Sequence, residues 1–342
     1  MRPKKKVKLQ DIAEALGISV VTVSNALAGR KGVSEALRGE IVETAAAMGY
    51  AASGRTAKPK TEKKRKETVG LLLAPDAAGH VRPWQSALAG RLEEELKKEN
   101  MSLRVIRAVR EDIAHETIPA DALKTAGLIV CGDPGTAYLR QLRLRLGAPI
   151  VCCGFFDSHE MLDYVLDDGF HNMGLVYDRL AALGHRDIAI VCGNMDSPEA
   201  HDHFLGACFE EALRRKNPEE LPVMPDPETC TPERFLTLAR DGKATAAVCT
   251  DSDTAGALIH MLRAESLRIP EDISVTGYSL DPEGSRSSGI SEVIPDFGGL
   301  AKQTVKLLMH RMDGKERSGV RLVPGLFLEG STIGSEKEVR HG

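Results

Sequence analysis

Three hydroxyls and one carboxamide lie close together near the start of the chain, and their chemistry suits a nucleic acid. They belong to Ser19, Thr22, Ser24 and Asn25. Hydroxyls of this kind bind phosphate groups, and a carboxamide can form two hydrogen bonds with N6 and N7 of adenine. Serine and asparagine also cap helix ends, so Ser19 and Asn25 have a second interpretation as structural caps.

Two short helices must position these side chains. Gly17 separates two runs of helical apolar spacing, and Ser19 is a typical N-cap for the second run. Two helices joined by a glycine turn are typical of a helix-turn-helix, whose second helix enters the major groove of DNA. A third helix is predicted from Ser34 to the Gly49-Tyr50 pair. The apolar positions of the first two helices are Ile12, Ala13 and Leu16, and then Val23 and Leu27.

The charge of the chain is divided unevenly along its length. Residues 1–66 contain 15 Lys and Arg against 6 Asp and Glu, a net charge of +9, whereas the remaining residues carry −13. A basic head on an acidic body suits phosphate binding at one end only. A solvated charged tail is an alternative for the first lysines, but it does not explain the helix-turn-helix pattern among them. We predict a head over residues 1–50, a basic linker over 51–67 and a body over 68–342.

Beyond the linker, short apolar strands alternate with helical stretches, which is typical of parallel α/β sheets. The predicted strands are 69–74, 103–108, 127–131, 149–153, 187–192, 246–249 and 273–277. We therefore predict an all-α head followed by an α/β body of two doubly wound lobes with a cleft between them. The first lobe is expected over 68–166 with 293–322, and the second over 167–292 with 323–337.

Composition and missing motifs argue against several classes of protein. No apolar run approaches the ~20 residues of a membrane span, and the basic N-terminus lacks the apolar stretch of a signal peptide, so we expect a cytoplasmic protein. The seven cysteines lie in apolar runs, and the adjacent pair Cys152-Cys153 does not have the spacing of a zinc or redox motif. We expect reduced cysteines, no metal and no cofactor. Hydrolase, phosphate-loop and zinc-protease motifs are missing, so we predict no enzymatic activity.

A set of short motifs follows one order along nearly the whole chain. In the head they are Asp11-Ile-Ala, Gly17-Ile-Ser, Thr22-Val-Ser, Val33-Ser34 and Gly49-Tyr50. In the body they are Leu183-Gly-His-Arg-Asp-Ile-Ala189, Thr250-Asp251 with Ala255-Gly-Ala257, and Ile269-Pro-Glu-Asp-Ile-Ser-Val-Thr-Gly-Tyr278. Their combination resembles the lactose-repressor (LacI/GalR) family of bacterial transcription factors. The resemblance implies a DNA-reading head and a periplasmic-binding-protein-like effector domain that dimerises.

The resemblance also implies which side chains read DNA. The base-reading positions of the family correspond to Val20, Val21 and Asn25, and the two valines offer only apolar contact, for instance with thymine methyl groups. The linker departs from the family, because after Tyr50 there is no leucine, isoleucine or phenylalanine before Leu71 that could insert into the minor groove. The cations expected along the minor groove or the phosphates instead are Arg55, Lys58 and Lys60.

Five positions are implied to contact an effector between the lobes. They are Trp84, Asp168, His203, Asp251 and Ser279. Trp84 is the only tryptophan, and its flat ring suits the face of a sugar or base, although a core position at a helix start is an alternative. Asp251 and Asp168 suit ligand hydroxyls, and helix capping is an alternative for Asp251. His203 and Ser279 replace an arginine and an aspartate that many sugar-binding members carry, so the effector class stays open, with a carbohydrate as the family expectation.

We therefore predict a sequence-specific DNA-binding transcriptional regulator, a repressor, controlled by a small-molecule effector. A homodimer is expected to read a palindromic double-stranded operator, because its two-fold symmetry requires two equivalent half-sites. Two rival interpretations come from other classes of protein. One is a solute-binding module of a transporter without any DNA function, and the other is an enzyme on a related α/β scaffold.

Overall fold

The computed structural model describes two compact units, residues 1–66 and residues 67–342, and each is considered by itself. The described residues are 7–27, 33–48, 67–76, 78–193, 198–214, 226–281, 284–285, 288–314 and 319–336. None of the helices in this part of the chain is long and apolar enough to cross a membrane.

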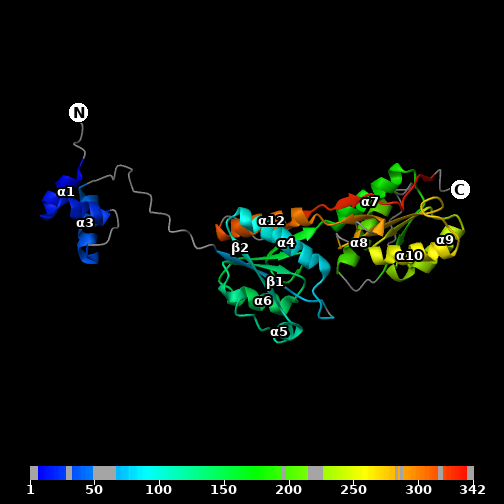
Figure 1. Ribbon diagram of the computed structural model, residues 1–342, viewed down its shortest axis with the longest axis horizontal. Helices are drawn as coiled ribbons and strands as arrows, with labels where there is room; N and C mark the ends of the chain where they lie inside the picture. The colour runs from blue at the N-terminus through cyan, green and yellow to red at the C-terminus, as the bar shows by residue number, and fades with distance from the viewer. Residues whose placement is uncertain are drawn as a thin grey trace, which may run out of the picture. The chain divides into compact units, whose positions relative to one another are not determined.

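The head is a three-helix unit, as predicted (Figure 1). Its helices are α1 (Leu9–Leu16), α2 (Val20–Leu27) and α3 (Glu35–Ala47). Gly17 ends α1 in the left-handed conformation, with φ of 66°, which glycine adopts without the steric cost that other residues have. The chain can therefore turn sharply into α2. The buried core that holds the three helices together consists of Ile12, Ala13, Val23, Ala26, Ile41 and Ala45.

The first lobe of the body is a six-stranded parallel sheet in the order β10-β5-β4-β3-β1-β2. Its strands are β1 (Thr68–Leu73), β2 (Ser102–Arg107), β3 (Gly127–Cys131), β4 (Ile150–Cys153), β5 (Asp163–Asp167) and β10 (Val320–Val323). Its helices are α4 (Pro83–Lys98), α5 (Arg110–Ala114), the 3-10 turn η1 (Ala122–Lys124), α6 (Thr136–Arg145) and α12 (Phe297–Met312).

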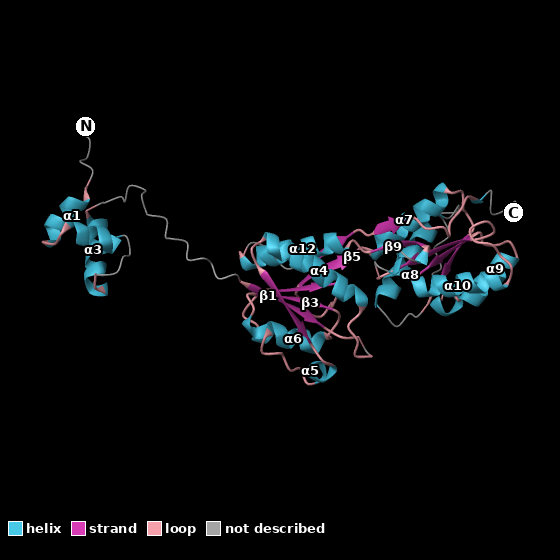
Figure 2. Cartoon of the chain, viewed as in Figure 1, coloured by secondary structure: helices cyan, strands magenta, loops and turns pink. Residues whose placement is uncertain are grey.

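Alternation along the strands builds two apolar layers in this lobe. Leu71 and Leu73 of β1 pack with Leu88 and Leu92 of α4, in a cluster that α12 completes. Leu72 faces the other side and packs in a second cluster with α6. Because both faces are covered, the central strands β1, β3 and β4 are apolar along nearly their whole length rather than alternating. Figure 2 shows the strands of this lobe between α4 with α12 and α6.

The second lobe has a five-stranded sheet in the order β11-β9-β8-β7-β6, parallel except for β11. Its strands are β6 (Ile188–Val191), β7 (Ala246–Cys249), β8 (Ser274–Tyr278), β9 (Ser291–Ile294) and β11 (Leu326–Leu328). Its helices are α7 (Gly169–Ala182), α8 (Pro198–Arg214), η2 (Pro227–Thr229), α9 (Pro232–Arg240) and α10 (Ser252–Ala264). Apolar side chains of α7 and α8 cover one face, and those of α9 and α10 cover the other.

The chain passes between the two sheets after β5, β9 and β10, which end at Asp167, Ile294 and Val323. The lobe boundaries expected from the sequence, after residues 166, 292 and 322, fall within the last residues of these same strands. The cysteines carry no disulfide, and all but Cys230 are buried.

Gln85 connects the carboxyl ends of two first-lobe strands to the start of α4. Its side chain is buried, and Nε2 donates to the carbonyl oxygens of Ala74 and Cys131 at 2.9 and 2.8 Å. Its Oε1 accepts the backbone N–H of Arg82 at 2.7 Å. A side chain on Gly132 would lie 2.6 Å from the Ala74 carbonyl oxygen, so the glycine leaves room for this contact.

We predict that Gln85→Leu lowers the free energy of unfolding by about 1–3 kcal/mol, because it leaves buried backbone groups without partners. Urea unfolding of the full chain checks this value. Gln141→Leu on α6 is the matched control, since that half-buried carboxamide makes no hydrogen bond to another described residue. An equal loss in both variants would contradict the assigned role of Gln85.

Candidate functional site

Helix α2 presents one face outward from the head. Val20 is 41% exposed and Val21 67%, whereas Val23 and Ala26 on the opposite face are buried in the core. Asn25 is half-buried, and its carboxamide makes no hydrogen bond to another described residue. The residues implied to read bases thus lie on the outward side of α2, with polar capacity left on Asn25.

Ser19 is the N-cap of α2. Its Oγ accepts the backbone N–H of Thr22 at 3.1 Å and lies 2.8 Å from the Thr22 Oγ1. The capping interpretation of Ser19 is therefore confirmed, and its hydroxyl keeps further hydrogen-bonding capacity for a phosphate. No comparable cap is formed by Asn25 among the described residues, although capping was its alternative interpretation.

An arginine that sequence reasoning did not single out holds the other end of α2. The Nη1 of Arg38 on α3 donates to the carbonyl oxygen of Ala26 at 2.7 Å. Carbonyl groups in the last turn of a helix have no partner within the helix, so this contact satisfies one of them and connects α2 to α3. The linker residues Arg55 and Lys58 lie outside the described residues.

In the second lobe, Asp251 follows the carboxyl end of β7 and caps α10. Its Oδ1 accepts the Thr254 N–H at 2.7 Å, and its Oδ2 accepts the Thr254 hydroxyl at 2.8 Å. A Cβ on Gly193, which follows β6, would collide with the Asp251 carboxylate. Open α/β sheets bind ligands at the carboxyl ends of their strands, so the cap of α10 lies at the edge of the sheet where such folds bind ligands.

His203 of α8 is buried against the same strand ends. Its Nδ1 lies 2.9 Å from the carbonyl oxygen of Thr250, and because a carbonyl only accepts, Nδ1 carries the proton. Burial lowers the pKa of His203 to about 4, so the ring is neutral at pH 7. Its Nε2, which has no hydrogen bond within the described residues, is left as an acceptor. The ring stacks on Tyr278, with centroids 3.5 Å apart.

Ser279 comes directly after Tyr278, at the end of β8. It is buried, and its Oγ accepts the backbone N–H of Asp281 at 3.1 Å. The second lobe thus brings three of the implied effector residues together. His203 contacts Thr250, which precedes Asp251, and Tyr278, which precedes Ser279.

The other two implied residues occupy different places. Trp84 begins α4 in the first lobe, where a Cβ on Gly154 would lie 2.7 Å from its Cη2. No hydrogen bond or ring contact joins Trp84 to the three second-lobe residues in the described part of the chain. Asp168 caps α7, since its Oδ1 accepts the His171 N–H at 3.1 Å, directly where the chain enters the second lobe.

A polar network that sequence reasoning missed connects the lobes. The Tyr278 hydroxyl of β8 donates to Oδ2 of Asp167, the last residue of β5. Asn172 of α7 donates to both Asp167 oxygens at 3.0 Å, and its Oδ1 accepts the Gly325 N–H at 2.6 Å. Burial raises the pKa of Asp167 to about 6, against the hydrogen bonds from Tyr278 and Asn172, which favour the carboxylate.

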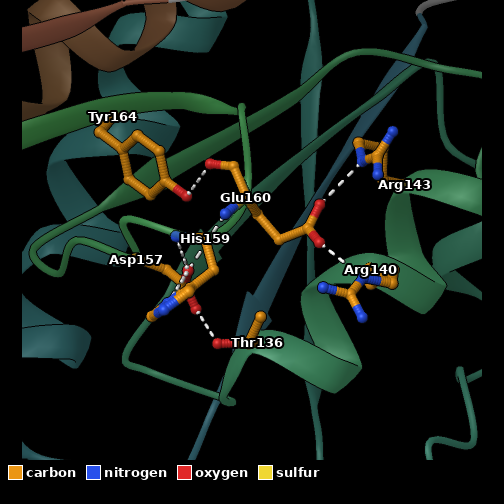
Figure 3. A network of polar contacts seen from close by, with 7 residues as sticks. All are labelled: Thr136, Arg140, Arg143, Asp157, His159, Glu160 and Tyr164. Atoms are coloured by element: carbon orange, nitrogen blue, oxygen red, sulfur yellow. Dashed lines mark hydrogen bonds and ion pairs between the residues drawn. The ribbon is translucent and has the colours of Figure 1, made fainter.

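A second cluster of charged residues forms its ion pairs and hydrogen bonds within the first lobe (Figure 3). The Glu160 carboxylate is buried and accepts from Nε of Arg140 and of Arg143 at 2.8 and 2.9 Å. Burial opposes its ionisation, but the two arginines outweigh burial and lower the pKa of Glu160. Asp157 accepts the Thr136 hydroxyl at 2.6 Å beside it. These contacts connect α6 to the segment before β5 and satisfy the charges inside the lobe.

We predict that Asp167→Asn changes the pH dependence of stability. The native pKa of Asp167, about 6, lies above its ordinary value of 3.8, so its contribution is present below pH 3.8 and is lost as the pH rises through 6. The free energy of unfolding of the wild type, relative to that of the variant, should fall by about 3 kcal/mol between pH 3.8 and 6, because each pKa unit corresponds to about 1.4 kcal/mol.

Urea unfolding at a series of pH values measures this difference. Asp272→Asn is the control with the opposite sign, because the hydrogen bond from Arg268 lowers the pKa of Asp272. Its advantage should therefore be lost as the pH falls. If the stability difference between wild type and variant changed with pH in the same direction for Asp167→Asn and Asp272→Asn, the assignment of a raised pKa to Asp167 would be contradicted.

Comparison with known proteins matches the head and the body separately. Residues 8–53 match the bacterial regulatory proteins of the lacI family, and residues 177–332 match the periplasmic binding protein-like domain. The HTH-type transcriptional repressor PurR of Histophilus somni is 24% identical over 340 residues, covering 94% of this chain and 98% of that protein. The ribose operon repressor of Haemophilus influenzae is 23% identical over 325 residues, covering 89% and 91%.

Solved structures share the fold over most of the chain. The lac repressor dimer bound to operator and the anti-inducer ONPF has a TM-score of 0.59 and 21% identity, covering 96% of this chain and all of that one. The complex of the regulator CelR with cellobiose has a TM-score of 0.58 and 19% identity, with the same coverage. A LacI family regulator from Enterococcus faecium with bound ribose reaches 0.56 over 79% of this chain. In its head, in its body and in their order, the chain resembles the LacI/GalR family of bacterial transcriptional regulators along nearly its whole length.

Proposed function

We propose that this protein is a LacI-type transcriptional repressor that binds a palindromic operator as a homodimer and responds to a small molecule bound by its body. The observation that carries this proposal is the outward face of α2, where two exposed valines and an unengaged carboxamide lie on a three-helix unit whose flanking segments in the sequence are basic. Its place of action is the cytoplasm, where the DNA is.

In this proposal, only three side chains contact the bases of each half-site. Asn25 pairs with an adenine, and Val20 and Val21 contact thymine methyl groups. The hydroxyls of Ser19, Thr22 and Ser24 bind phosphates and set the register of the helix on the duplex. In the linker, Arg55 and Lys58 add contacts along the minor groove or the phosphates, and the dimer sets the spacing of the half-sites.

Selection of duplexes from a random pool, followed by gel shifts over a salt series, tests this function. A repressor of this kind selects one palindrome, and its affinity falls steeply with salt because counterions are released from the DNA. A solute-binding module selects no duplex, and removal of residues 1–66 leaves its weak affinity for DNA unchanged. Either result would refute the repressor.

We predict that Asn25→Ala weakens binding to the selected palindrome by about 1–3 kcal/mol per half-site, while binding to random DNA changes little. Loss of a base contact removes discrimination at one operator position, whereas loss of a phosphate contact weakens all sequences alike. Gel shifts on both duplexes measure the two affinities. Gln10→Ala, which removes an exposed carboxamide from α1, is the matched control. Equal losses on both duplexes would exclude base recognition by Asn25.

The effector site is proposed to lie at the strand ends of the second lobe, with Trp84 and Asp168 contributing from the first lobe and from the crossing. A neutral His203 offers only an acceptor at Nε2, and Asp251 beside it is an acidic acceptor. Acceptors of this kind favour a ligand rich in O–H or N–H donors and oppose an anion. An uncharged carbohydrate satisfies both requirements, and cellobiose and ribose occupy related proteins.

We predict that D-ribose or cellobiose raises the melting temperature of the full chain and that ribose 5-phosphate does not, because none of the five residues proposed for the site is a cation that could neutralise the phosphate. Asp251→Asn should abolish the shift while leaving operator binding intact, since asparagine keeps the cap of α10 and removes only the charge. Asp226→Asn, at the cap of η2, is the matched control. A shift that survives Asp251→Asn would remove this residue from the site.

A further inference from the structure

Tyr278 is in contact with two different parts of the body. The face of its ring stacks on His203, at an interplanar angle of 27°. Its hydroxyl donates to Asp167, which ends the last strand before the chain leaves the first lobe. The same hydroxyl oxygen accepts from Asn172 Nδ2 at 2.6 Å. The Tyr278 side chain is buried, and its hydroxyl contacts a half-buried carboxylate at the end of β5.

The three crossings between the lobes lie at or next to the network of Tyr278, Asp167 and Asn172. Asp167 ends the first crossing strand, and Asn172 accepts the N–H of Gly325 on the third. A Cβ on Gly325 would lie 2.6 Å from the carbonyl oxygen of Ile294, which ends β9, the strand before the second crossing. Close packing leaves little room for one crossing to move without the others.

We propose that Tyr278 is a positioning residue that transmits the state of the effector site at His203 to the lobe crossing at Asp167. This inference rests on the proposed function, because it takes His203 to be an effector contact. A ligand donor that binds Nε2 of His203 shifts the imidazole, and the stacked ring of Tyr278 follows because it is held on its face. The hydroxyl then changes its hydrogen bond to Asp167, and with it the geometry of the crossing.

The electrostatics of Asp167 make this contact measurable. Tyr278 and Asn172 donate to its carboxylate, while the neighbouring charge of Asp168 opposes ionisation. The midpoint of the Asp167 titration therefore reports the hydrogen bond from Tyr278. Loss of that donor disfavours the carboxylate and raises the midpoint.

The experiment measures the midpoint of the Asp167 titration in the full-length chain. It compares the unfolding free energy of each protein with that of its Asp167→Asn form over a series of pH values. We expect His203→Ala to move the midpoint by about 0.3 pH unit or more, a factor of about two in the protonation equilibrium. Tyr278→Phe should raise the midpoint by itself. In the Tyr278→Phe background, His203→Ala should then have no effect on it.

Two further variants keep the outcome decisive. Tyr138→Phe removes another buried tyrosine hydroxyl, which donates to the Thr117 carbonyl oxygen at 3.3 Å in the first lobe, and it should leave the midpoint unchanged. If His203→Ala is too unstable to titrate, His203→Gln replaces it, since glutamine keeps a donor for the Thr250 carbonyl and loses the ring. An effect of the His203 variants that is absent, or equal in both backgrounds, overturns the proposal. The measurement uses neither operator nor effector, so its failure is distinct from failure of the proposed function.

Discussion

One half-buried carboxylate, that of Asp167, connects the two lobes of the body through the hydrogen bonds that it accepts. A carboxylate that leaves water must be hydrogen-bonded or protonated, and here the donors come from β8 and α7 of the second lobe while Asp167 itself ends a first-lobe strand. The two lobes therefore share a single polar network. Its raised pKa shows that the balance is close, since burial still outweighs the donors. A balance of this kind is easily altered by a small change in hydrogen-bond geometry.

Residues 1–66 and the strand ends of the second lobe differ in the polar groups that they offer to a ligand. The head and the linker together carry a net charge of +9 over residues 1–66, which suits a polyanion. At the strand ends of the second lobe, the groups are acceptors, namely the neutral His203 and the Asp251 carboxylate. Because long-range charge steers an anion toward a basic segment, the DNA contacts and the effector site that we propose lie in differently charged parts of the chain.

Much of the fold followed from local patterns, and much of the site did not. The helices of the head and the central strands of both sheets were predicted, because buried strands between helices leave a strong apolar signal. The strands β5, β9, β10 and β11 were missed, since they are short and carry polar residues such as Asp163 and Glu292. Asp251 was nominated by the family resemblance and by its place after a strand, and its role in binding stays a prediction. The contact of Tyr278 with Asp167 joins residues 111 positions apart, and no local pattern encodes it.

The sparse reading face that we propose for α2 sets a condition on the rest of the protein. One carboxamide contact is worth about 1–3 kcal/mol of discrimination, so two half-sites supply about 2–6 kcal/mol. Specific binding is typically stronger than non-specific binding by about 4–10 kcal/mol. Valine contacts and the fixed separation of two heads must supply the remainder, because phosphate contacts bind all sequences alike. Control of the distance between the heads is then control of specificity itself, and a body whose lobe crossings meet in one network is suited to exert it.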